Sequence, residues 1–254
     1  AVGEGYGDKI FYLTAKTITR TVAEEAFSIL KGKGLSYKTL TITSKEKMCL
    51  MDEVECNPEK CPYANGHFDR VNDAVYELLT EQDTYQREEL LMQARKWQVC
   101  PFEMCLDTST WVDAVICDYN YVFDPNVYLK RFFGDGVKGD YLFLIDEAHN
   151  LVDRGRNMYS AVLCKEDFLE VKKAVKEHSR KLERILEKCN KVLLEYKREC
   201  QDEYRVMENI GALALQLMNL LGEMENFLER EQEEKVRSTV LEFSFAVRHF
   251  LNMY

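Results

Sequence analysis

Five apolar residues lead directly into two adjacent carboxylates in the stretch Tyr141-Leu142-Phe143-Leu144-Ile145-Asp146-Glu147-Ala148-His149-Asn150. An apolar run of this length, rich in residues that favour β-structure, predicts a strand buried on both faces, as in a parallel sheet under helices. Asp146 and Glu147 would then lie at the carboxyl end of that strand, where open α/β sheets place their ligands. An aspartate there can hold the Mg²⁺ of a nucleotide, and a neighbouring acid can orient the attacking water. The alternative is an acidic helix N-terminus, where both side chains complement the helix dipole.

The composition indicates a globular chain with a substantial core. Hydrophobic residues make up 46% of the 254 residues, enough for one large domain or two smaller ones. No apolar run approaches the length of a membrane span, and the N-terminus has neither the basic nor the apolar region of a secretory signal. Because the sequence does not begin with Met, we expect it to be a fragment of a longer protein. The net charge of −10 argues against a protein that coats nucleic acid, but it allows a local basic track along one groove.

A βαβ unit is predicted ahead of the acidic stretch. Residues 9–15 form a short strand, residues 16–27 lead into a helix that ends at two glycines, and residues 37–43 form a second strand. Such a unit is expected to be parallel and right-handed. Lys16 and Arg20 follow the first strand among three threonines, a set that can contact phosphates, with solvated surface charge as the alternative. The glycines at positions 3, 5 and 7 are not a nucleotide loop, because the sequence contains no Gly-x-x-x-x-Gly-Lys-Ser/Thr pattern.

The cysteines indicate a metal or cluster site. In a chain without a secretory signal, nine cysteines favour ligation over a disulfide framework. Cys61 and Cys100 are each followed by proline, which fixes the backbone of a loop on which thiolates converge. Four thiolates bind either zinc or an iron–sulfur cluster, and the spacing Cys-x₆-Cys-x₄-Cys followed by a gap of 38 residues fits a zinc ribbon poorly. The group concerned comprises Cys49, Cys56, Cys61, Cys100 and Cys105.

Ordinary structural roles are the main expectation for the other cysteines and for a nearby histidine. His67 could be a ligand, but a histidine beside Phe68 in a polar loop is more often solvated or hydrogen-bonded. The remaining cysteines fall on apolar positions and are expected to be buried packing residues. They are Cys117, Cys164, Cys189 and Cys200.

The second half of the sequence changes character. Residues 114–123 predict a third strand and its exit, which ends at Asp124-Pro125. From Glu166 onward proline is absent, and apolar residues recur at helical spacing in three long stripes. The stripes are wider than a coiled-coil seam, so a helical bundle is predicted, with a two-helix arm as the competing form. No catalytic constellation is visible there.

Taken in order, these motifs closely resemble the iron–sulfur DNA helicases of the XPD/DinG type, within helicase superfamily two, and are most similar to bacterial DinG-like members. Asp146-Glu147-Ala148-His149 is similar to the Walker B box that names the DEAH group. The resemblance is strong in residues 9–21, 45–63, 97–125 and 141–152.

The resemblance implies an α/β fold in four parts. A partial RecA-like parallel-sheet motor domain would comprise residues 1–44 and 111–160. An iron–sulfur cluster domain would be inserted at 45–110, and an all-α arch domain would follow at 161–254.

Roles for particular residues are also implied by the resemblance. Asp146 would coordinate Mg²⁺, Glu147 would act as the general base toward water, and His149 would couple the nucleotide state to a second motor domain. The residues implied to contact single-stranded DNA are Thr14, Lys16, Thr17 and Arg20. The implied ligands of a [4Fe–4S] cluster are Cys49, Cys56, Cys61 and Cys100. Cys105 is extra to this pattern, and is either a spare thiol or a replacement for Cys56 or Cys61.

The implied activity is that of an ATP-dependent DNA helicase, moving 5′ to 3′ on single-stranded DNA in repair or replication, with ATP, Mg²⁺ and a [4Fe–4S] cluster. Its partners would be single-stranded DNA, duplex junctions and ATP. It would be a cytoplasmic monomer, associated with the nucleoid when on DNA, and would not bind membranes. The Walker A lysine and the motifs of the second motor half are absent, so the chain alone is expected to be inactive.

Three alternatives remain at this stage. One is a non-catalytic nucleic-acid-binding scaffold stabilised by zinc or a cluster, which metal analysis would separate. A DEAH-type RNA helicase is disfavoured, since that class carries no four-cysteine insertion. A redox iron–sulfur protein is disfavoured by the paired carboxylates and by the phosphate-contacting residues after the first strand.

Overall fold

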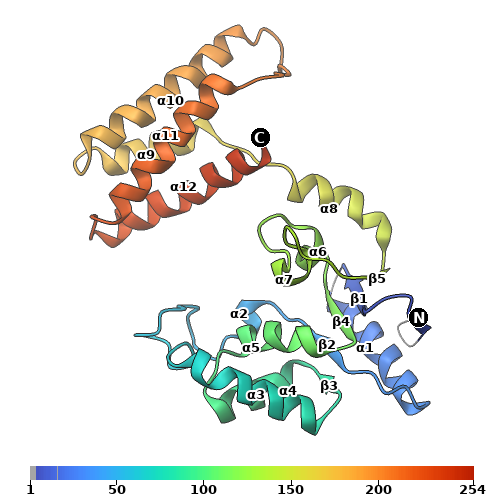
Figure 1. The fold of residues 1–254 in the computed structure, drawn as a ribbon. Coiled ribbons are helices and arrows are strands. Elements are labelled where there is room, and N and C mark those ends of the chain that lie inside the picture. Colours follow the sequence, from blue (N-terminus) through green and yellow to red (C-terminus); the bar gives the residue numbers. More distant parts are fainter. Residues whose placement is uncertain (1–3, 16) are drawn as a thin grey trace. The chain divides into compact units, whose positions relative to one another are not determined.

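The computed structural model describes residues 4–15 and 17–254, and the chain divides into two compact units, Ala1–Met158 and Tyr159–Tyr254 (Figure 1). Each unit has its own buried cluster of apolar side chains. The division made from the sequence, into a motor domain in two segments, a cluster domain and an arch domain, stays a prediction.

A five-stranded parallel sheet organises the first unit. Its order is β3-β2-β4-β1-β5, which differs from the order of the strands along the chain. Every strand pairing is parallel, as predicted for an α/β fold. The strands are β1 (Lys9–Thr14), β2 (Thr39–Thr41), β3 (Thr84–Tyr85), β4 (Ala114–Asp118) and β5 (Tyr141–Ile145).

Helices pack on the sheet through two separate apolar clusters. Helix α1 (Thr17–Gly32) places Ala23 and Phe27 against Ala114 and Ile116 of β4. A larger cluster contains side chains from β1, β2 and β4 together with side chains from the following helices. Those helices are α2 (Lys45–Met48), α3 (His67–Glu81), α4 (Arg87–Trp97), α5 (Pro101–Thr108), α6 (Asn120–Phe123), α7 (Lys130–Phe133) and α8 (Leu151–Met158), with short 3₁₀ turns at Ser109–Trp111 and Ala148–Asn150.

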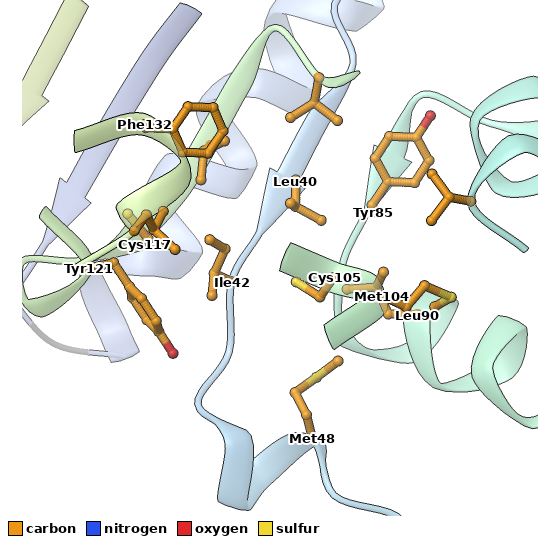
Figure 2. Close-up of a cluster of buried hydrophobic side chains, with 14 of the residues drawn as sticks. Leu40, Ile42, Met48, Tyr85, Leu90, Met104, Cys105, Cys117, Tyr121 and Phe132 are labelled. Atoms are coloured by element: carbon orange, nitrogen blue, oxygen red, sulfur yellow. The ribbon is translucent and has the colours of Figure 1, made fainter. Parts of the chain in front are cut away.

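The cysteine-bearing segment shares its core with the sheet. Leu40 and Ile42 lie in one buried cluster with Met104 and Cys105 of α5 and with Cys117 of β4 (Figure 2). Four of these five side chains are at most 1% exposed, and Ile42 is 3% exposed. The inserted segment is therefore attached to the sheet by continuous apolar packing, which stabilises both parts together.

Strand β5 corrects one sequence expectation. The apolar run predicts burial on both faces, but Phe143 is 41% exposed and Leu144 is 49% exposed. The reason is the strand order: within the described residues, β5 is the last strand of the sheet and pairs with β1 alone. Tyr141 and Phe143 still pack on Phe11, with ring centroids 5.4 and 5.7 Å away. An apolar run indicates a strand but does not say whether that strand lies at an edge.

The second unit is a group of four helices around one core. Phe168 and Phe243 meet edge to face at its centre, with ring centroids 4.9 Å apart. Apolar residues of all four helices belong to the same cluster, as expected of a bundle rather than a two-helix arm. The helices are α9 (Lys165–Val175), α10 (Arg180–Glu199), α11 (Gly211–Leu228) and α12 (Glu234–Met253). No helix within residues 4–15 and 17–254 is long and apolar enough to cross a membrane.

The cysteines predicted to be packing residues divide into two pairs. Cys117 and Cys189 are buried, as expected. The prediction is wrong for Cys164, which is exposed, and Cys200 is only half-buried. Cys164 is the N-cap of α9 and Cys200 is the C-cap of α10. At a cap the chain leaves the helix, so the apolar spacing of the helix no longer predicts burial there.

Candidate functional site

Three chemically distinct segments meet at the carboxyl edge of the sheet. The register aligns Thr14 of β1 with Asp118 of β4, and Leu13 of β1 with Ile145 of β5. The backbone N–H of Asp146 donates to the carbonyl of Leu13 at 3.0 Å. The predicted phosphate-contacting loop, the residues after β4 and the acidic turn after β5 are therefore neighbours, although the first lies more than 100 residues from the other two in the sequence.

The acidic turn has an unusual backbone. Glu147 adopts φ 51° and ψ 43°, a left-handed conformation that is uncommon for a residue other than glycine. The backbone N–H and the side-chain amide of Asn150 both donate to the Glu147 carbonyl, at 2.9 and 3.2 Å. The Glu147 carboxylate lies 3.2 Å from His149 Nδ1, and both side chains are exposed. A strained turn that presents functional groups to solvent is typical of a site at which a ligand binds.

Tyr119 stabilises the acidic turn through a hydrogen bond. Its hydroxyl donates to the backbone carbonyl of Asp146. Burial raises the pKa of Tyr119, and the nearby charges of Asp146 and Glu147 raise it further, with Arg154 opposing them. The hydroxyl therefore remains a proton donor, and the hydrogen bond to Asp146 persists at neutral pH.

A cavity of about 780 Å³ opens beside the strand ends. Thr14 and Arg20 line it together with Asp118 and Asn120 from the end of β4. Further basic side chains also line it, namely Lys45, Lys47, Lys130 and Arg131. In a chain with a net charge of −10, this cluster is a local basic track of the kind that the sequence left open.

Arg20 has a donor that the described structure leaves unsatisfied. Its Nη1 donates to Thr43 Oγ1 at 3.2 Å, and its Nε lies 3.9 Å from a Glu24 carboxylate oxygen. The Nε atom is buried, and no described residue serves as its hydrogen-bond partner. Glu24 balances part of the charge at this buried atom, while the guanidinium group lines the cavity, where an anionic ligand such as a phosphate can approach it. Of the other residues predicted for this role, Lys16 and the side chain of Thr17 lie outside the described part of the chain.

A second cavity, of about 360 Å³, is lined by Cys49, Cys56, Cys61 and Cys100. Helix ends position two of these residues: Cys49 is the C-cap of α2, and Cys100 is the N-cap of α5, with proline at the first helical position. Burial raises the pKa of the Cys100 thiol, whereas the backbone N–H groups of Glu103 and Phe102 lower it. A turn in which Cys61 N–H donates to Asn57 O at 2.7 Å shapes the loop between Cys56 and Cys61.

The cysteine cavity gathers the four predicted cluster ligands in one place. A zinc ion lies about 2.3 Å from each thiolate, which places the sulfur atoms roughly 4 Å apart. Among the residues that the structure describes, no three Cys, His, Asp or Glu side chains converge closely enough to hold one ion. The four cysteines nevertheless line one cavity, and thiolate sets of four bind either zinc or an iron–sulfur cluster.

His67 belongs to the wall of the same cavity. It is 4% exposed, and its Nδ1 accepts from the Cys100 N–H at 3.2 Å, so the imidazole is hydrogen-bonded rather than solvated. Its Nε2 is buried and has no hydrogen-bond partner in the described part of the chain. An unsatisfied buried nitrogen beside the four cysteines is a further sign that the cavity is built for a bound group.

Lys45 lies between the two cavities and was not singled out from the sequence. Lys45 and Phe102 line both cavities, and Lys45 Nζ lies 3.8 Å from Glu103 and 5.8 Å above the Phe102 ring. Burial opposes its charge, but a hydrogen bond to Cys56 and the charges of Cys56, Glu103 and Cys100 outweigh burial and raise the pKa of Lys45. A lysine four residues before Cys49 is the signal that could have identified it, because a cation stabilises nearby thiolates.

Cys105 occupies a different environment from the four cavity cysteines. It is fully buried in the core beside Met104, and it is not among the residues that line the cavity (Figure 2). Burial raises the pKa of its thiol to about 12. Both observations favour a packing role over ligation.

We therefore expect Cys105→Ala to lower the free energy of unfolding by about 1 kcal/mol, the usual cost of removing a small buried group, and to leave the metal content unchanged. Chemical denaturation and metal analysis of the same preparation would measure both effects. A loss of metal in this variant would mean that Cys105 is a ligand.

A parallel sheet with carboxylates at its carboxyl edge is consistent with a partial RecA-like domain. The chain belongs to the DEAD_2 family, whose model matches residues 14–168. It is similar to the Fanconi anemia group J protein homolog of Gallus gallus, with 33% identity over 88 residues, which cover 34% of this chain and 7% of that protein. It is also similar to the ATP-dependent DNA helicase CHL1 of Kluyveromyces lactis, with 22% identity over 169 residues, 61% of this chain and 21% of that protein.

Solved structures agree on the fold. A structure described as truncated XPD matches with a TM-score of 0.53 at 18% identity, covering 99% of this chain and 71% of that one. A second, described as XPD helicase, has a TM-score of 0.51 at 18% identity and covers 97% of this chain and 42% of that one. These matches confirm the resemblance to XPD/DinG-type helicases. The chain spans about a fifth or less of the curated relatives described above.

Proposed function

We propose that this chain is part of an ATP-dependent DNA helicase that carries a [4Fe–4S] cluster. The observation that carries the proposal is the arrangement of three sites in one unit. An acidic turn follows β5, a basic cavity lies at the same edge of the sheet, and a four-cysteine cavity shares Lys45 and Phe102 with the basic one. The conversion of ATP hydrolysis into strand movement needs a nucleotide site and a strand site in close contact.

At the nucleotide side, the carboxylate of Asp146 would coordinate the Mg²⁺ of bound ATP, and the ion would neutralise charge on the phosphates. Glu147 would accept a proton from the attacking water. Its carboxylate already contacts His149, at 3.2 Å, so a change at Glu147 would reach that imidazole directly. The relatives described above are much longer than this chain. Their length supports the proposal that a longer protein supplies the remaining motor segments.

At the strand side, the basic cavity would bind the backbone of single-stranded DNA. Arg20 and the neighbouring lysines offer positive charge to phosphates, and Tyr128 and Phe102 offer rings on which bases can stack. Movement from 5′ to 3′ and a preference for duplex junctions are carried over from the resemblance. A monomeric protein active in DNA repair is part of the same proposal.

The four thiolates would hold the cluster through iron–sulfur bonds. Cys49 and Cys100 fix the ends of α2 and α5, while Cys56 and Cys61 lie on the loop between α2 and α3. Ligation would therefore order that loop against the helices. Since Lys45 contacts the thiolates and also lines the basic cavity, the loss of the cluster would disturb the strand site as well.

Arg20→Ala is expected to weaken binding of a single-stranded oligonucleotide by about tenfold at low salt, because one charge-assisted hydrogen bond to phosphate is lost. The slope of log affinity against log salt should become shallower by about 0.7, the value for one phosphate contact on a single strand. Fluorescence anisotropy across a salt series measures both quantities. Lys33→Ala is the matched control, since Lys33 is exposed beyond the far end of α1. Equal effects from the two substitutions would contradict a specific contact at Arg20.

A further inference from the structure

Arg154 of α8 connects two other segments of the site edge. Its Nη2 donates to the backbone carbonyl of Ala15 at 2.8 Å, immediately after β1. Its Nη1 donates to Asn120 Oδ1 at 3.5 Å, and Nη2 lies 3.8 Å from Asp118 Oδ2. One guanidinium group therefore holds the loop after β1 and the segment after β4, while its own helix follows the acidic turn.

A second contact extends this network to the acidic turn itself. The Arg154 guanidinium lies 5.9 Å from the centre of the Tyr119 ring. The hydroxyl of that tyrosine donates to the carbonyl of Asp146. Ala15, Arg154, Tyr119 and Asp146 thus form a continuous chain of contacts from the strand-binding loop to the nucleotide-binding turn.

The neighbouring arginine on the same helix shows that these contacts are specific to position 154. Arg156 contacts Asp153 three residues earlier, at 3.3 Å, and its side chain is 75% exposed. The side chain of Arg154 is only 36% exposed, and its partners lie 34 to 139 residues away in the sequence. An ion pair of the exposed kind contributes little to stability, whereas a charge-assisted hydrogen bond that is partly shielded from water contributes more.

Arginine suits this position because its planar fork can donate to several acceptors at once and keeps its charge at any physiological pH. Asp118 and Asn120 also line the basic cavity, so Arg154 stands directly behind the surface on which a strand would lie. A shift of the loop at Ala15 would therefore be transmitted to Tyr119 and Asp146 through a short, rigid path.

We propose that Arg154 is a positioning residue that ties the loop after β1 to the Asp146–Glu147 turn, so that single-stranded DNA bound at the loop raises the rate of ATP hydrolysis at the turn. The inference rests on the proposed function. Arg154 would act from outside both sites, because it touches neither the strand nor the nucleotide.

The test compares Arg154→Met, Arg154→Lys and the control Arg156→Met in the complete helicase. For Arg154→Met, the rate of ATP hydrolysis without DNA should be unchanged, whereas the DNA-stimulated kcat should fall by about tenfold, as expected for the loss of one charge-assisted hydrogen bond. Arg154→Lys should restore part of the stimulation, since lysine keeps the charge but not the fork. Arg156→Met should behave as the wild type.

Hydrogen exchange provides a readout that does not depend on activity. Peptides that contain Ala15 or Tyr119 should exchange faster in Arg154→Met than in Arg156→Met, while peptides of the helical unit should not change. Normal DNA stimulation in Arg154→Met would overturn the inference, with or without faster exchange. A wild type without DNA-dependent hydrolysis would instead refute the proposed function, and the inference with it.

Discussion

Substitution of Cys100 by serine is expected to reduce the iron content of anaerobically purified protein from about four atoms per chain to less than about one. Cys100 lines the cysteine cavity and caps α5, so its loss removes a ligand and also releases the cluster from a helix end. A serine hydroxyl is a much weaker ligand for iron than a thiolate. Metal analysis and the visible absorption of the cluster would follow the loss.

The matched control is Cys164→Ser, which makes the same chemical change at an exposed cysteine in the other unit. It should keep its iron. If Cys100→Ser also retained full iron and the same visible spectrum, the proposed ligand set would be wrong. Stoichiometric zinc without iron in the wild type would favour the alternative of a zinc-stabilised, non-catalytic nucleic-acid-binding scaffold.

Glu147→Gln is expected to lower kcat for ATP hydrolysis in the complete helicase by about a thousandfold, the usual cost of removing a general base. Glutamine has nearly the same shape, and both hydrogen bonds from Asn150 go to the backbone carbonyl of residue 147, so the turn should persist. Binding of ATP and Mg²⁺ should therefore remain close to that of the wild type. Steady-state hydrolysis and equilibrium nucleotide binding measure the two effects separately.

Asp153→Asn is the control for this substitution, because Asp153 is an exposed carboxylate on the next helix that pairs with Arg156, three residues away. It should leave kcat unchanged. A Glu147→Gln variant with wild-type turnover would show that Glu147 is not the base. If Glu147→Gln also lost ATP binding, the substitution would have disrupted the turn itself. His149→Gln would then test whether the contact between His149 and Glu147 holds the turn.

The local sequence predicted four of the five strands and the helical second unit, but not the short strand β3. The chemistry assigned to these elements stays a prediction. Strands were identified by apolar runs, the second unit by apolar residues at helical spacing, and the fold class from their alternation. Asp146 and Glu147 could be placed at a strand end because the carboxylates follow the apolar run directly. The prolines that directly follow two cysteines, and a spacing unlike that of a zinc ribbon, identified the cysteine group as candidate ligands. Most of these signals depend on residues that are close in the sequence, so periodicity or direct adjacency makes them visible.

The tertiary structure alone decided which of these elements are neighbours. The strand order β3-β2-β4-β1-β5 places β5 at the edge and exposes Phe143 and Leu144, which an apolar run cannot predict. It also brings Lys45 between the two cavities, directs Cys105 into the core, and joins Arg154 to Ala15 across 139 residues. Contacts of this kind depend on the pairing of distant strands, whose energy is shared among many side chains and leaves no periodic trace in the sequence.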